Sequence, residues 1–222
     1  AITAVIDFDT VSDVEQVVLS KDSSGAVDID IAAMTTTTTE PTAMTIDGSA
    51  VVSSTGTLKF NKSENTSNDT YVTTAFTIKG GLNNDTLYGA GGADTITTGA
   101  GTNTAGGNSG NDTITGGSGA DTIAGDAGAD SLVGAGGADT ITGGAGNDTI
   151  DLSGVLDGSE VHLQNIDTVN DTIVKVSGTR TDTVNDDGKL TVDLGGSETM
   201  TIYHEEADDD MMASLLIDTL VS

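Results

Sequence analysis

Residues 116–124 read Gly-Gly-Ser-Gly-Ala-Asp-Thr-Ile-Ala, and nine-residue units of this type fill residues 80–151 without an insertion. The eight units begin at residues 80, 89, 98, 107, 116, 125, 134 and 143. Positions one and four are Gly, position six is Asp and position eight is a large aliphatic residue, each in seven of the eight units. A flexible linker has no reason to keep Asp and the aliphatic residue in phase, so the repeat predicts a folded structure.

The repeat predicts a stack of short strands. One aliphatic side chain per unit cannot form a core alone, so the units must cover one another. The β-branched residues around position eight favour a strand, and Gly-x-x-Gly-x-Asp favours a tight turn, because Gly accepts positive φ. Two strands and two turns close a coil of 18 residues, so eight units give about four coils and a stack of about 20 Å. The side chains predicted to line its interior are Leu87, Ile96, Ile114, Ile123, Leu132, Ile141 and Ile150.

The charge of these units indicates a bound cation. Residues 80–151 contain nine Asp and no Lys, Arg or Glu, and stacking places Asp over Asp at the strand spacing. Like charges at that distance repel by roughly 1 kcal/mol in water and by more when they are partly buried. A hard divalent cation would compensate this charge, and carboxylate and carbonyl oxygens are the ligands that calcium prefers.

The eight units resemble the repeats-in-toxin (RTX) array, Gly-Gly-x-Gly-x-Asp-x-aliphatic-x, which folds as a calcium-loaded parallel β-roll in exported bacterial proteins. The resemblance implies an all-β fold with Ca²⁺ held between turns that are two repeats apart. It implies that the metal is bound at the sixth-position aspartates and fourth-position glycines, namely Asp85, Asp94, Asp112, Asp121, Asp130, Asp139, Asp148, Gly92, Gly110, Gly128 and Gly146.

Two columns of turns follow from this resemblance, because turns two units apart share a side. The first column consists of Asp94, Asp112, Asp130 and Asp148. The second column consists of Asp85, Asn103, Asp121 and Asp139. Unit three departs from the pattern at Thr98, Asn103, Ala105 and Gly106. We therefore expect the first column to be fully loaded and the second to bind calcium weakly or incompletely near Asn103.

The region before the array, residues 1–79, is rich in Thr and Ser. Short alternating runs such as Val27, Ile29 and Ile31 predict a β-solenoid or a sandwich-like region. The stretch from Val11 to Leu19 is similar to the repetitive β modules that precede RTX repeats in bacterial surface-layer proteins.

The region after the array, residues 152–222, predicts a β-rich cap. Two alternating runs around Gly195 and Gly196 are expected to pair, with Leu190 and Val192 on one strand and Met200 on the other. An acidic segment at 205–210 then precedes an apolar tail at 211–220. This end is either a short helix whose acidic start meets the helix dipole or a segment similar to an uncleaved type I secretion signal.

Composition excludes several classes of function. The chain has 35 Asp plus Glu against 7 Lys plus Arg, a net charge of −28, which argues against binding to nucleic acid or to anionic lipid. It has no Cys, so it forms no disulfide and no thiolate metal site. No apolar run approaches the roughly 20 residues of a membrane span, so no membrane insertion is expected. The sequence opens at Ala1 without a basic segment, so a processed or partial chain with no N-terminal signal peptide in view is expected.

Catalytic motifs are not found in the sequence. It has no His-Glu-x-x-His zinc motif and no Gly-x-Ser-x-Gly nucleophile elbow. His162 and His204 lie in predicted strands without a partner motif, and are interpreted as ordinary surface residues. The chain is therefore predicted not to be an enzyme.

The sequence predicts a secreted, calcium-binding structural protein at the bacterial cell surface or outside the cell. The expected role is a self-assembling subunit of a surface layer, an extracellular matrix or an adhesin, forming a homo-oligomer, lattice or filament and contacting cell-surface polysaccharide. The alternative is the C-terminal export and folding module of a type I-secreted hydrolase whose catalytic domain lies outside this chain. A zinc or serine-hydrolase motif upstream of Ala1 would favour the alternative.

Overall fold

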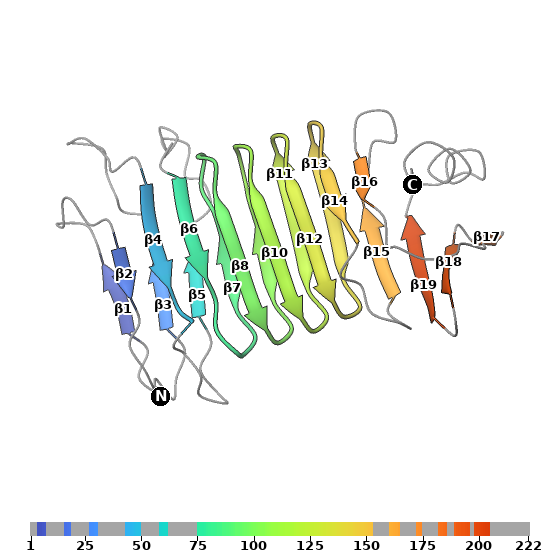
Figure 1. Cartoon of the computed structure of the whole chain (residues 1–222). Coiled ribbons are helices and arrows are strands. Elements are labelled where there is room, and N and C mark those ends of the chain that lie inside the picture. The colour runs from blue at the N-terminus through green and yellow to red at the C-terminus, as the bar shows by residue number, and fades with distance from the viewer. Residues whose placement is uncertain are drawn as a thin grey trace.

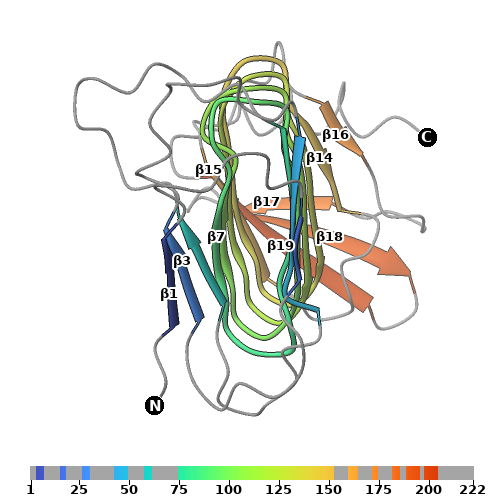
Figure 2. The ribbon, with the colours of Figure 1, turned by 90° about the vertical axis from the view of Figure 1, so that its left-hand side faces the viewer.

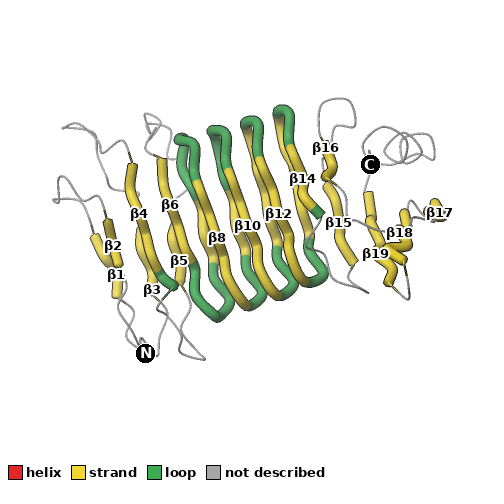
Figure 3. The backbone as a smooth tube through the Cα atoms, in the orientation of Figure 1, coloured by secondary structure: helices red, strands yellow, loops and turns green. Residues whose placement is uncertain are grey.

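The computed structural model describes residues 4–7, 16–18, 27–30, 43–49, 58–61, 75–152, 160–164, 172–174, 182–185, 189–195 and 198–204. Every regular element in these residues is a β-strand, as Figure 3 shows. The acidic and apolar C-terminal segment, for which a helix or a secretion signal is expected, lies outside the described residues. No helix of the described part is long and apolar enough to cross a membrane.

The strands alternate along the chain between two sheets as far as β16 (Figure 1). The larger sheet has, in spatial order, β1 (Ala4–Asp7), β3 (Val27–Asp30), β5 (Leu58–Asn61), β7 (Thr86–Tyr88), β9 (Thr104–Gly106), β11 (Thr122–Ala127), β13 (Thr140–Ala145), β15 (Glu160–Gln164), β19 (Glu198–His204), β18 (Lys189–Gly195) and β17 (Asp182–Asn185). The smaller sheet has β16 (Thr172–Val174), β14 (Thr149–Asp151), β12 (Ser131–Gly136), β10 (Thr113–Ser118), β8 (Thr95–Ala100), β6 (Ala75–Lys79), β4 (Ala43–Asp47) and β2 (Gln16–Val18).

Within the repeats, each strand pairs in parallel with the strand two units away. Ile96 aligns with Ile114, and Ile114 with Leu132, so the register advances by one coil of 18 residues. In the other sheet Ile123 aligns with Ile141 in the same way. Viewed along the stack in Figure 2, the coils of the repeat segment superimpose. The predicted parallel β-roll of about four coils is thereby confirmed.

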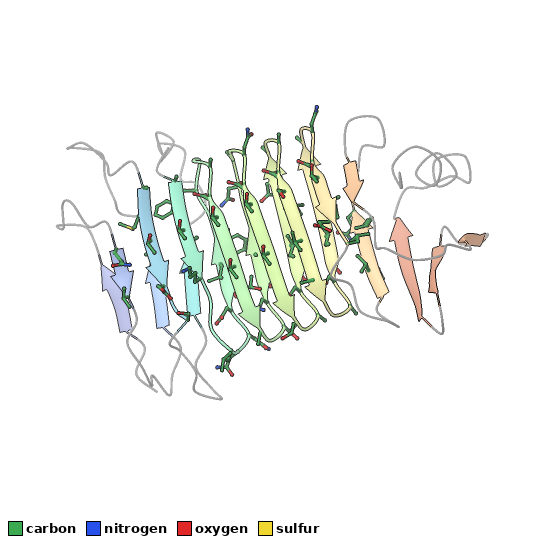
Figure 4. The ribbon with its side chains drawn as sticks, in the orientation of Figure 1. Carbon is green, nitrogen blue, oxygen red and sulfur yellow. The ribbon has the colours of Figure 1, made fainter. Side chains whose placement is uncertain are left out.

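The position-eight side chains form the core between the two sheets. All seven aliphatic residues predicted to line the interior are fully buried, and Ala105 is 2% exposed. The side chains drawn in Figure 4 recur from coil to coil along the stack. Alternation of buried and exposed residues, as in β8 and β11, follows from the period of two that a strand imposes.

The described strands before the repeats continue the same two sheets. Ile46 of β4 aligns with Ile78 of β6, which aligns with Ile96 of β8. The core of these earlier coils is bulkier than that of the repeats, since Met44 and Phe76 are both buried beside the isoleucines. Of the two architectures expected for residues 1–79, the described strands have the parallel pairing of a solenoid.

Five of the eight repeat strands are longer than the sequence predicts, whereas β7, β9 and β14 have the expected three residues. Strands such as β10 contain six residues instead of three, because they continue through positions one to three of the next unit. Backbone hydrogen bonds between coils also continue there: Gly101 N donates to Ser118 O at 2.9 Å, and Gly119 N donates to Gly136 O at 2.8 Å. After these longer strands only positions four to six form the turn, because the carbonyl of position three, such as Ser118 O, still accepts from the neighbouring coil.

After β15 the larger sheet changes direction. β19 pairs in parallel with β15 and antiparallel with β18, which pairs antiparallel with β17. Leu190 aligns with Ile202 and Val192 with Met200, so the expected pairing in the C-terminal region is confirmed.

Candidate metal centre

The sixth residue of every unit lies at the end of a turn, directly before a strand, and its side chain is buried. This burial contrasts with the usual exposure of Asp and Asn side chains. The exposed fraction is 2% or less for each of Asp85, Asp94, Asn103, Asp112, Asp121, Asp130, Asp139 and Asp148. Burial of so many carboxylates within one small roll requires compensation from donors or from cations.

Hydrogen bonds connect these side chains into the two expected columns. In the first column Asp94 N donates to Asp112 Oδ1 at 2.8 Å, and Asp112 N donates to Asp130 Oδ1 at 2.8 Å. Asp130 N donates to Asp148 Oδ1 at 3.0 Å. In the second column the same bond joins each residue to the next through Asp85, Asn103, Asp121 and Asp139. The structure therefore brings together the members of each column, one per coil.

The second carboxylate oxygen, Oδ2, lacks a hydrogen-bond donor in four of the column aspartates. The Oδ2 atoms of Asp112, Asp121, Asp130 and Asp139 are buried and have no hydrogen-bond partner. A carboxylate oxygen can only accept, and leaving a buried polar atom without a partner costs about 1–3 kcal/mol, more when the group is charged. These four oxygens are therefore the atoms at which a cation would contribute most.

A backbone carbonyl lies close to three of these four oxygens, those of Asp112, Asp121 and Asp130. A Cβ added to Gly116 would lie 2.6 Å from Asp121 Oδ2 and 2.7 Å from Gly134 O in the next coil. The same pair of oxygens surrounds Gly107, with Asp112 Oδ2 and Gly125 O, and Gly125, with Asp130 Oδ2 and Gly143 O. Two acceptors face one small space, and any residue larger than Gly would fill it. We call this space the cradle of a unit; it fits a hard cation.

The fourth-position glycines lie over one another from turn to turn. Gly110, Gly128 and Gly146 have φ values of +122°, +154° and +143°. A Cβ on any of them would overlap the carbonyl oxygen of the glycine one coil earlier, which for Gly110 is that of Gly92. Glycine is required here for its positive φ and for this close approach.

Burial raises the pKa of the column aspartates. The pKa of Asp112 rises to about 7, mainly by desolvation and further through the charges of Asp94, Asp130 and Asp126. Desolvation likewise raises the pKa of Asp94 and of Asp121 to about 6, and raises the pKa values of Asp130 and Asp139. Without a cation the charged form of these groups is therefore disfavoured near neutral pH.

Asp85 and Asp94, in the first two units, receive protein donors at Oδ2. Gly81 N donates to Asp85 Oδ2 and Ala90 N donates to Asp94 Oδ2, each at 2.7 Å. Oδ1 of Asp94 also accepts from Phe76 N at 2.6 Å. Both carboxylate oxygens of Asp94 therefore have donors, so no orphaned oxygen at this position supports the expectation that the first column is fully loaded with calcium.

The orientation of one peptide bond explains this difference. The second residue of the unit has a positive φ in units three to eight, whereas Gly81 and Ala90 do not. In unit two the carbonyl of that peptide, Gly89 O, accepts from Asn108 Nδ2 at 2.8 Å. The sequence pattern does not identify Asn108, because its contact lies one coil away and its place at position two is the only signal.

Side chains alone do not complete a metal site in the described part of the chain, where no group of three or more His, Asp or Glu residues converges. A cation in the cradle must therefore take backbone carbonyl oxygens as well as carboxylates. Such mixed oxygen sets are those that Ca²⁺ accepts, with six to eight ligands.

Comparison with known families agrees with this chemistry. The model of the RTX calcium-binding nonapeptide repeat (4 copies) matches residues 77–105, 106–141 and 124–154. Repeats of this family bind Ca²⁺, form a structural β-roll and are typical of secreted bacterial proteins. The chain matches no curated protein in sequence.

Proposed function

Because residues 77–154 consist of RTX calcium-binding nonapeptide repeats, we propose that the chain is a secreted structural protein whose β-roll folds when it binds extracellular calcium. The observation that carries the proposal is the set of four buried carboxylate oxygens without donors, at Asp112, Asp121, Asp130 and Asp139. Contact with a cation would compensate the free-energy cost of burying each of these charged oxygens.

The proposed ligands combine a carboxylate with carbonyls of the same column. Oδ2 of Asp112 and Gly125 O form one pair, Asp121 and Gly134 a second, and Asp130 and Gly143 a third. Asp148 extends the first column, and the carbonyls of the fourth-position glycines, Gly92, Gly110, Gly128 and Gly146, lie in the same turns. Bound calcium would supply positive charge at these oxygens.

Calcium binding and folding are coupled in this proposal. Where free calcium is scarce, repulsion and desolvation of the column aspartates oppose stacking of the coils. Where calcium is plentiful, the binding free energy becomes folding free energy. Sites of extracellular modules have dissociation constants of about 10⁻⁴ to 10⁻³ M, and stacking of neighbouring coils adds cooperativity.

The number of bound ions tests the proposal. The 222-residue chain is dialysed to equilibrium against about 5 mM calcium, above the affinity range of extracellular modules, and bound metal is measured by atomic emission. We expect at least four ions per chain, one for each orphaned carboxylate oxygen. A chain that binds no calcium would contradict the proposal.

The biological role proposed for the β-roll is that of a self-assembling surface-layer, matrix or adhesin subunit. The net charge of −28 and the β-rich flanks support this role, since calcium can also bridge acidic surfaces of neighbouring copies. Electron microscopy with calcium should show lattices or filaments that EGTA disperses. Monomers under both conditions would instead favour an export and folding module of a larger secreted enzyme.

A further inference from the structure

Unit three lacks both residues that build the cradle, with Thr98 at position one and Asn103 at position six. Its coil is nevertheless stacked in register, since Thr104 of β9 aligns with Thr86 below and with Thr122 above. Thr98 is fully buried and Asn103 is 1% exposed. Two polar side chains at this depth must have found partners.

The two side chains form a chain of hydrogen bonds. Asn103 Nδ2 donates to Thr98 Oγ1 at 3.2 Å and to Gly101 O at 3.2 Å. Thr98 Oγ1 donates in turn to Gly116 O, in the next coil, at 2.6 Å. Asn103 Oδ1 accepts from Asp85 N at 2.8 Å, which fixes the orientation of the amide. We call this connection the Thr98–Asn103 relay.

Comparison with unit five shows what the relay replaces. In unit five the cradle lies between Asp121 Oδ2 and Gly134 O, around the point where Gly116 has no Cβ. In unit three the equivalent ends are the Asn103 side chain and Gly116 O. Thr98 supplies a side chain at the equivalent point, and its hydroxyl connects the two ends. In unit five the two acceptors, Asp121 Oδ2 and Gly134 O, have no hydrogen-bond donor between them. In unit three the Asn103 amide and the Thr98 hydroxyl each donate a hydrogen bond.

We propose that the Thr98–Asn103 relay is a cation substitute built into the second column, so that unit three binds no calcium and its coil stacks without it. This inference rests on the proposed function, because it defines the relay by the calcium sites it replaces. It identifies Thr98 and Asn103 as the residues that set where the calcium-dependent part of the roll begins.

The neighbouring units extend the calcium-independent part. Backbone N–H groups of Gly81 and Ala90 donate to Oδ2 of Asp85 and Asp94, and Asn103 Nδ2 donates to Thr98 Oγ1, so the sixth-position side chains of units one to three have no orphaned atom at the place of Oδ2. This part of the roll adjoins the bulkier apolar core around Phe76. Coils up to β9 therefore form a template on which the calcium-loaded coils assemble.

A reciprocal exchange tests the relay. The T98G/N103D chain acquires the cradle of unit five, and the G116T/D121N chain acquires the relay of unit three. We expect T98G/N103D to bind one ion more than the wild type and G116T/D121N to bind one ion fewer, as measured by equilibrium dialysis. In EGTA we expect T98G/N103D to have a lower Tm than the wild type and G116T/D121N a higher one.

Single substitutions separate the relay from ordinary packing. In N103D the Thr98 hydroxyl has one proton for two acceptors, so we expect a lower Tm in EGTA and no additional ion. In T98G the Asn103 amide loses its acceptor and faces an empty space, so we again expect a lower Tm in EGTA and no additional ion. An unchanged ion count in both double variants, with calcium still bound by the wild type, would overturn the relay. A wild type that binds no calcium would instead overturn the proposed function.

Hydrogen exchange of the wild type in EGTA tests the template. We expect amides of β6 to β9 to be protected at least ten-fold more strongly than those of β11 to β13, since only the latter follow cradles with orphaned oxygens. Equal protection in both groups would contradict a calcium-independent template.

Discussion

At the scale of single residues, the hydrogen-bonding capacity of the sixth side chain decides what a turn needs. A carboxylate only accepts hydrogen bonds, whereas an amide also donates them. Asn103 can therefore satisfy its surroundings through Thr98, and Asp121 in the next turn of the same column cannot. Asp94 shows a third solution, in which backbone N–H groups serve both carboxylate oxygens.

Substitution of two aspartates of the first column should have different effects. Asp130→Ala removes an orphaned oxygen, so we expect one ion fewer and a calcium midpoint of folding raised several-fold. Asp94→Ala removes acceptors for two backbone N–H groups, so we expect a loss of about 1–3 kcal/mol in calcium and in EGTA alike. Calcium titrations followed by circular dichroism measure both, and identical behaviour of the two variants would contradict the assignment.

Ala135 has a φ of +70°, although it is not glycine. An L-residue in this region of φ destabilises the fold by roughly 1–2 kcal/mol. Replacement by Gly removes this strain, but it also increases the conformational entropy of the unfolded chain, which offsets part of the gain. We therefore expect Ala135→Gly to raise the free energy of unfolding by about 0.5–1 kcal/mol. Ala90→Gly is the matched control at position two, where φ is not positive, and should lower it. Chemical denaturation in saturating calcium measures both.

At the scale of the coil, the period of nine predicts most of what the structure shows. It predicts the 18-residue register and the position-eight core, because both follow from repetition along the chain, whereas the two columns of turns follow from the resemblance to the RTX array. The six-residue length of β10 and the donors to Asp94 could not be predicted in this way. They depend on hydrogen bonds to the neighbouring coil, such as that of Asn108 to Gly89, and on the orientation of one peptide.

The columns should give the roll an unusual dependence on pH. Folding raises the pKa of Asp112 to about 7, from about 3.9 in the unfolded chain. In EGTA this group stabilises the fold fully below about pH 4, and the contribution is lost as the pH rises through about 7. We therefore expect the chain in EGTA to show a stronger β signal by far-UV circular dichroism at pH 5 than at pH 8.

The Asp112→Asn chain is the control for this dependence, since general repulsion in a chain of net charge −28 acts on both proteins. Its difference in β signal in EGTA between the two pH values should be smaller than that of the wild type. Calcium affinity should show the opposite trend and rise with pH, because protons compete for the same oxygens. Greater stability of the calcium-free wild type at pH 8 would disagree with the burial of these carboxylates.

At the scale of the whole molecule, two kinds of coil share one pair of sheets. Coils with Met44 and Phe76 in the core resemble an ordinary solenoid, whereas the repeat coils have one aliphatic residue per unit. The sequence indicates this change through composition, but it leaves open a solenoid or a sandwich before the repeats. The parallel alignment of Ile46, Ile78 and Ile96 distinguishes the two, because it is a long-range pairing that no local pattern encodes.

The central claim is that cations complete the fold at buried carboxylates. Far-UV circular dichroism of the 222-residue chain at pH 7.5, titrated with calcium from EGTA to about 10 mM, tests it most directly. We expect a cooperative gain of β signal in the millimolar range or below, reversed by EGTA and not reproduced by an equal concentration of magnesium, which demands stricter octahedral geometry. A spectrum that stays the same throughout the titration would contradict the account.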